Sequence, residues 1–256
     1  MDVILIGHSF VRRFKDHFCR DTRGTGKDIS EPELAESLSQ RLSIDHHFKR
    51  LYTISQGVIF IRDLYQHVQN IDQFVSNPTV IILDIGSNDL AQLHRSTPDR
   101  CLKLASELVD MAETLTLHRL IKLVIIHSVV PRFSRINSTI DNFYKNFVSF
   151  NKYVQHLCSI TDSVQYHKLR GFFHRNRTSS HSTWWTSDGI HCNARGLDTY
   201  KARLRHGLLF NRHSIHWIDI LLLLFLNNTD QFQPYTIHVL YNIIILALCV
   251  IASCII

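Results

Sequence analysis

The chain lacks the motifs that mark several common classes of protein. Its glycines form no Gly-rich phosphate fingerprint, its six cysteines include no C-x-x-C pair, and it has no internal repeat. Its 17 histidines never stand with cysteines or acidic residues at the spacing of metal ligands. These absences argue against a nucleotide-binding loop and a secreted disulfide framework, and we expect neither a metal nor a cofactor.

Composition indicates a globular protein. The 256 residues are 45% hydrophobic and 20% charged, which suits one sizeable α/β domain with an appendage and excludes disorder of the whole chain. The net charge of +6 would permit contact with nucleic acid, but lysines and arginines are scattered. We interpret the densest sites, Arg12-Arg13 and residues 170–177, mostly as solvated surface. A nucleic-acid partner is therefore not expected, and a nucleic-acid-associated accessory domain is the weakest alternative.

Apolar runs alternate with segments of helical spacing along residues 1–210. Strands are predicted at 3–6, 51–54, 80–85, 123–130 and 164–167, and helices at 10–18, 31–42, 59–68, 98–117, 140–157 and 194–210. This alternation predicts a three-layer α/β/α fold around a five-stranded parallel sheet. In such a fold, ligands bind at the carboxyl ends of the strands.

Three short segments at those strand ends, or in the last loop, together carry the chemistry of nucleophilic catalysis. They are Gly-His-Ser-Phe at 7–10, Gly-Ser-Asn-Asp at 86–89 and Asp-Gly-Ile-His at 188–191. A serine nucleophile needs a base, the base needs an orienting carboxylate, and the developing oxyanion needs donors. The three-residue spacing of Asp188 and His191 puts both side chains on one short turn, so that one imidazole nitrogen can face the carboxylate and the other Ser9.

These segments, with Ser55-Gln56-Gly57, resemble the sequence blocks of the SGNH (GDSL-type) family of serine esterases over roughly residues 1 to 210. The resemblance implies a flavodoxin-like SGNH hydrolase fold and cleavage of small-molecule carboxylic esters. It implies Ser9 as nucleophile, His191 as base and Asp188 as the orienting acid. The Ser9 and Gly57 N–H groups and the Asn88 amide would form the oxyanion hole. The family usually has Asp where this chain has His8.

Each segment also has a structural alternative. Ser9 could be a helix N-cap, Asp188-Gly189 and Gly57 could be ordinary turn residues, and residues 86–89 could be a loop that Asp89 orders. The G-x-S-x-G pattern of α/β-hydrolases fails because Val11 follows Phe10. A catalytically inactive SGNH-like module for binding or membrane tethering is the rival function.

Three further residues are candidates for the substrate pocket. His8 could tune the site or be a harmless replacement. Trp184 and Trp185, at the end of the loop over 171–187, could line an acyl or alcohol pocket or pack over the sheet edge.

After Arg212 the composition changes, so we expect domain boundaries of 1–212 and 213–256. Residues 239–256 form an almost uninterrupted apolar run, just long enough to span a bilayer. This run could be a tail anchor, with Arg203, Arg205 and Arg212 keeping the domain cytosolic, or a non-functional extension. Because no basic, apolar leader precedes the first predicted strand, we expect a cytoplasmic protein, with membrane contact through 239–256. The sequence predicts no oligomeric state.

Overall fold

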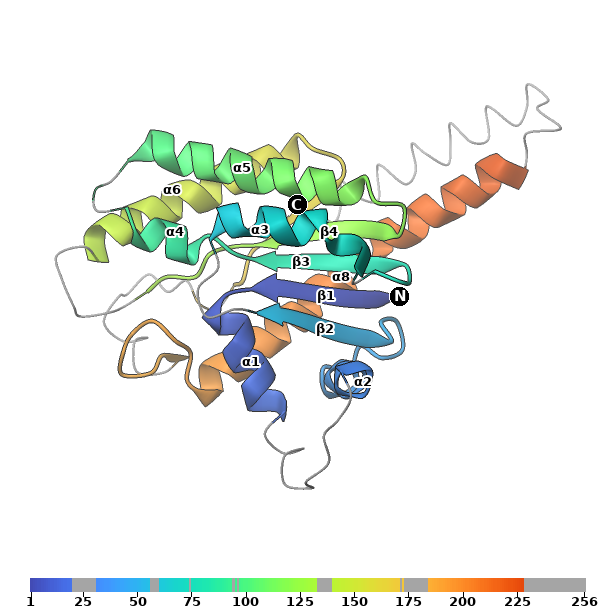
Figure 1. Cartoon of the computed structure of the whole chain (residues 1–256), viewed down its shortest axis with the longest axis horizontal. Coiled ribbons are helices and arrows are strands. Elements are labelled where there is room, and N and C mark those ends of the chain that lie inside the picture. Colours follow the sequence, from blue (N-terminus) through green and yellow to red (C-terminus); the bar gives the residue numbers. More distant parts are fainter. Residues whose placement is uncertain are drawn as a thin grey trace. The chain divides into compact units, whose positions relative to one another are not determined.

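The structure is a computed structural model that describes residues 1–19, 31–55, 60–73, 75–93, 95, 97–132, 140–170, 172 and 184–227. The chain divides into two compact units, Met1–Phe210 and Asn211–Ile256. The first unit contains the sheet (Figure 1) and, by their residue numbers, the predicted site residues Ser9, Asn88, Asp188 and His191. Gly57 and residues 239–256 lie outside the described residues.

Five parallel strands form the central sheet in the order β2-β1-β3-β4-β5. Every residue of the central strands β1 and β3 is buried, because helices cover both faces of the sheet. The five-stranded parallel sheet predicted from the apolar runs is therefore confirmed. The strands are β1 (Asp2–Gly7), β2 (Arg50–Ser55), β3 (Thr79–Asp84), β4 (Ile121–His127) and β5 (Val164–His167).

The helices form the two outer layers (Figure 1). On one face lie α3 (Ile61–Gln69), α5 (Pro98–Thr116) and α6 (Ile140–Ser159), with the short helix α4 (Ser87–Ala91) beside α6. On the other face lie α1 (Ser9–Cys19), α2 (Glu31–Arg41) and the first turns of α8 (Ala194–Asn227). The ring of Tyr200 in α8 packs against Phe10 and Phe14 of α1, and these contacts hold the two helices together in the second layer. The three-layer architecture agrees with the prediction.

Two element ends differ from the sequence prediction by three residues or more. Strand β4 ends at His127, three residues before the predicted end, because the side chain of Asn151 in α6 hydrogen-bonds both backbone groups of Val129, each at 2.8 Å. Helix α8 continues past Phe210 to Asn227, and the sequence between these two residues contains neither glycine nor proline. Among the described residues, no helix is long and apolar enough to cross a membrane.

Candidate active site

Ser9 lies immediately beyond the carboxyl end of a central strand. Strand β1 ends at Gly7, His8 forms the turn, and Ser9 is the first residue of α1. A side chain at position 7 would bring its Cβ within 2.9 Å of the backbone oxygen of Asp84 on the neighbouring strand. The tight turn that carries Ser9 therefore requires glycine before it.

His8, rather than Ser9, occupies the N-cap position of α1. The carbonyl oxygen of His8 accepts the N–H of Arg12 at 3.3 Å, and its Nδ1 accepts the N–H of Phe10 at 3.3 Å. Burial, with smaller contributions from Arg132 and His191, lowers the pKa of His8 to about 3. The imidazole is therefore neutral near pH 7, and its Nδ1 stays an acceptor.

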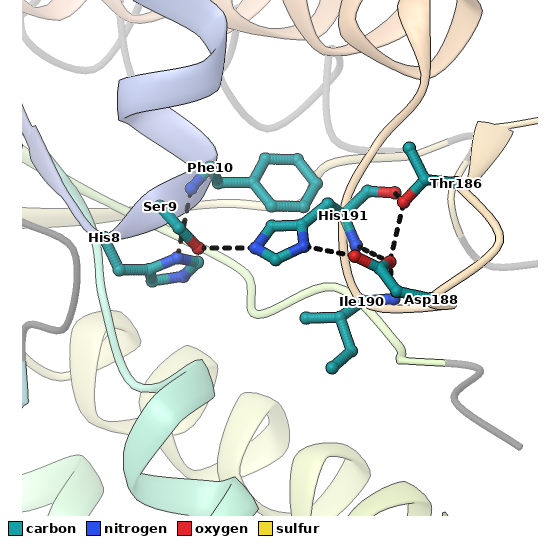
Figure 2. Close-up of polar contacts among 7 residues, drawn as sticks. All are labelled: His8, Ser9, Phe10, Thr186, Asp188, Ile190 and His191. Atoms are coloured by element: carbon teal, nitrogen blue, oxygen red, sulfur yellow. Dashed lines mark hydrogen bonds and ion pairs between the residues drawn. The ribbon is translucent and has the colours of Figure 1, made fainter. Parts of the chain in front are cut away.

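The hydroxyl of Ser9 joins a chain of hydrogen bonds that ends on a carboxylate (Figure 2). The Ser9 Oγ atom lies 3.1 Å from Nε2 of His191, although 182 residues separate the two in sequence. On the other side of the ring, Nδ1 of His191 lies 2.6 Å from Oδ2 of Asp188. The structure thus brings Ser9, His191 and Asp188 together in the order that the sequence predicts.

The carboxylate of Asp188 is held by its own loop. Its Oδ1 accepts hydrogen bonds from the Thr186 hydroxyl at 2.6 Å and from the N–H groups of Ile190 and His191 at 2.8 and 3.0 Å (Figure 2). Burial alone would raise the pKa of Asp188, but the hydrogen bonds from His191, Thr186 and the backbone lower that pKa below its usual range. Asp188 is therefore ionised and fixed in orientation. The same hydrogen bonds also make it a turn residue, as in the alternative interpretation of Asp188-Gly189.

Asn88 emerges from the strand next to the one that leads to Ser9. Gly86 caps α4 with a left-handed backbone (φ 109°), and the half-buried Asn88 follows in the first turn. Strands β1 and β3 pair directly, with Gly7 opposite Asp84, so Ser9 and Asn88 rise from the same edge of the sheet. The Oδ1 atom of Asn88 accepts a hydrogen bond of 2.8 Å from Nη2 of Arg132. The third predicted donor, Gly57, lies outside the described residues.

Asp89 connects this turn to helix α3. Both of its carboxylate oxygens accept the N–H of Ile61, at 3.3 and 3.2 Å. Burial raises the pKa of Asp89 to about 6, against the hydrogen bond from Ile61. These contacts agree with the interpretation that Asp89 orders the loop.

The two tryptophans differ in burial. Trp185 is 3% exposed and packs edge-on against Phe10 and Phe172, with ring centroids 6.0 and 6.1 Å apart. Trp184 is half-buried, and its ring centroid lies 6.3 Å from that of Phe172. Trp185 thus packs in the aromatic core as in the alternative interpretation, and a pocket role for Trp184 and Trp185 stays a prediction.

Two residues of the site carry no role in the sequence motifs. Thr186 stands two residues before Asp188, and threonine hydroxyls in loops commonly form local hydrogen bonds, so its position was a usable signal. Arg132 follows Pro131 in the connection after β4, and only the folded chain brings it to Ser87 and Asn88. No local pattern identifies it.

Among the described residues, no three His, Cys, Asp or Glu side chains gather as a metal site.

Comparisons with known proteins identify the family and the fold of the chain. The model of the GDSL-like lipase/acylhydrolase family matches residues 3–199. A GDSL-like lipase from Bacteroides thetaiotaomicron is 12% identical with a TM-score of 0.56, over 80% of this chain and 86% of that one. A lipase from a goat rumen metagenome is 14% identical (TM-score 0.53; 80% and 96% covered), and an acetyl xylan esterase is 16% identical (0.52; 81% and 99%). Such low identities show a shared fold alone. No curated protein matches the chain significantly.

Proposed function

Because the chain belongs to the GDSL-like lipase/acylhydrolase family, the SGNH hydrolases, we propose that it is a serine esterase that cleaves carboxylic ester bonds. One observation carries the proposal. The Ser9 hydroxyl, the two nitrogens of His191 and the Asp188 carboxylate are linked by contacts of 3.1 and 2.6 Å. These contacts support an activated serine, because they place a base in reach of the nucleophile and an acid where it can orient the base.

The mechanism follows from the protonation states that this geometry favours. The ionised Asp188 accepts a hydrogen bond from the N–H at Nδ1 of His191, which leaves Nε2 of the neutral ring as the acceptor facing Ser9. As Ser9 Oγ attacks the ester carbonyl, Nε2 takes its proton and then returns it to the departing alcohol. A water molecule, activated by the same nitrogen, clears the acyl group and regenerates Ser9. These proton transfers use side chains and water, and they need neither metal nor cofactor.

The negative charge on the carbonyl oxygen requires donors near Ser9. The backbone N–H of Ser9 lies in the first turn of α1 and has no partner within the helix, because no helical carbonyl group precedes the first N–H groups of a helix. The Asn88 side chain and the N–H of Gly57 would supply the other donors.

Fluorophosphonate labelling of the full-length chain tests the proposal. The probe phosphonylates an activated serine with loss of fluoride, so we expect one adduct, mapped by peptide mass spectrometry to Ser9, in native protein and none after denaturation. Ser9→Ala must abolish the adduct. A folded wild-type chain that takes no label and hydrolyses no p-nitrophenyl ester would reject esterase activity in favour of the inactive binding module. A cytoplasmic location and a membrane tether through 239–256 remain separate predictions.

A further inference from the structure

Arg132 makes three contacts with the turn that carries Asn88 and with the helix behind it. Its Nε donates to Ser87 Oγ and its Nη2 donates to Asn88 Oδ1, both at 2.8 Å. Its guanidinium carbon lies 5.5 Å from the centre of the Phe143 ring in α6. Ser87 is 4% exposed, so the fork of Arg132 is anchored on a buried hydroxyl while it contacts the neighbouring amide.

The contact with Asn88 decides which end of the amide can donate. The oxygen of a carboxamide only accepts, and the nitrogen only donates. With the guanidinium bonded to Oδ1, the opposite orientation of the amide would place two sets of N–H donors against each other. The charged donor therefore fixes Oδ1 on the side of Arg132 and turns Nδ2 to the other side.

Arg132 is also a permanent cation inside the site. Burial lowers the pKa of Arg132 to about 10, against the attraction of Asp188, so the group stays charged at neutral pH. The same charge contributes to the low pKa of His8, which places it within electrostatic reach of the nucleophile turn. A charged donor also makes a stronger hydrogen bond to Asn88 Oδ1 than a neutral donor would.

We propose that Arg132 is a positioning residue, which holds the Asn88 amide with its nitrogen towards the oxyanion of the ester reaction. The inference rests on the proposed function. The competing explanation is that Arg132 only anchors the connection after β4 to Phe143 and Ser87.

A double-mutant cycle separates these explanations. Asn88→Ala is expected to lower kcat by roughly 10² to 10³, as loss of one oxyanion donor does elsewhere, and Arg132→Met by about 10- to 100-fold with KM nearly unchanged. If Arg132 acts through Asn88, adding Arg132→Met to Asn88→Ala costs less than about threefold more. An equal loss in both backgrounds overturns the proposal. Arg132→Lys, which keeps the charge without the fork, should recover only part of the activity.

Arg50→Met is the matched control. Arg50 also makes a two-point contact, to Asp2 at 3.2 and 2.8 Å, and also lies 5.5 Å from an aromatic ring, that of Tyr52. It stands at the amino ends of the strands, away from the site. This variant should lose stability without a change in kcat, so a kcat loss in Arg132→Met of matched stability cannot be attributed to loosened packing.

A second measurement does not depend on activity. The side-chain amide signals of Asn88, identified by their loss in Asn88→Ala, should show an order parameter near 0.85 in wild type and below about 0.6 in Arg132→Met. An unchanged order parameter in Arg132→Met overturns the positioning role. If the wild-type chain shows no more hydrolysis than Ser9→Ala, the proposed function fails, and the order parameter still decides whether Arg132 holds the amide.

Discussion

The hydroxyl of Tyr200 donates a hydrogen bond of 2.6 Å to Oδ2 of Asp84, across 116 residues of sequence. Both side chains are buried, Tyr200 in α8 and Asp84 at the carboxyl end of β3. The backbone oxygen of Asp84 also faces Gly7, the glycine before the nucleophile turn. This buried bond therefore ties α8 to the strand end that lies against the candidate site.

Asp84→Asn should make the protein more stable at alkaline pH. Burial raises the pKa of Asp84 from 3.8 to about 6, against the hydrogen bond from Tyr200. The folded chain then binds more protons than the unfolded chain between about pH 4 and 6, so the free energy of unfolding falls as pH rises through that window. Asparagine is never charged and its oxygen can still accept from Tyr200, so we expect a gain of ~1–3 kcal/mol over wild type at pH 8.

Urea unfolding of both proteins at pH 4, 6 and 8 measures this difference. Comparing variant with wild type at each pH cancels the titration of other groups, including Asp89. If the difference in free energy of unfolding between variant and wild type does not change with pH, then either Asp84 stays protonated throughout the range or the folded protein fully stabilises its charge.

Ser9→Ala and His191→Ala should each lower the hydrolysis of short p-nitrophenyl esters by on the order of 10³-fold or more, because nucleophile and base act as one unit. The double variant should be no worse than either single one. His17→Ala, at the far end of α1, is the control for loss of a helix or histidine contact and should keep wild-type turnover. Wild-type activity in either site variant contradicts the assignment.

Asp188→Asn should reduce kcat/KM less than His191→Ala does. The asparagine oxygen can still accept the N–H groups of the loop, but its amide nitrogen would face Nδ1 of His191 and favour the wrong tautomer. The base is thus present but misprotonated, rather than absent. A loss as large as that of His191→Ala would mean that the Asp188 charge does more than orient the ring, and the ratio of the two kcat/KM values decides the question.

The sequence predicts the sheet well because its central strands, β1 and β3, are fully buried apolar runs. The prediction fails at the end of β4. There, Val129 and Val130 extend the apolar run, but the side chain of Asn151 forms hydrogen bonds with both backbone groups of Val129. A hydrogen bond from a side chain on a distant helix leaves no trace in local periodicity. The strand length therefore could not be read from residues 123–130.

The same contrast between local sequence patterns and long-range contacts holds for the candidate site. Ser9, Asn88, Asp188 and His191 lie in short motifs whose residue types carry their chemistry, so the sequence was enough to single them out. Arg132 lies 44 residues from Asn88, in no motif, and its contacts exist only because β3 and β4 are neighbours in the sheet. Residues that support a site from adjacent strands need the folded chain to identify them.

His8→Asp tests the position at which this chain departs from its family. His8 caps α1 through a single acceptor, Nδ1, which binds the N–H of Phe10. Aspartate is a far better N-cap, worth about 1 kcal/mol over residues that cap poorly, and its charge would suit both the helix N-terminus and the nearby Arg132. The cost of burying a carboxylate offsets part of this gain. We expect the gain to be at least as large as the cost, so turnover and Tm should be kept or raised.

Two companion variants identify which property of the side chain matters. His8→Ala removes the acceptor and should lower Tm and turnover together, because the Phe10 N–H then loses its partner. His8→Asn keeps a neutral acceptor and should stay close to wild type. If His8→Asp loses turnover while its circular dichroism and Tm match wild type, the imidazole takes part in the reaction itself, because capping would have been preserved. The replacement of the family's carboxylate would then be a change of function at the nucleophile turn and not a tolerated substitution.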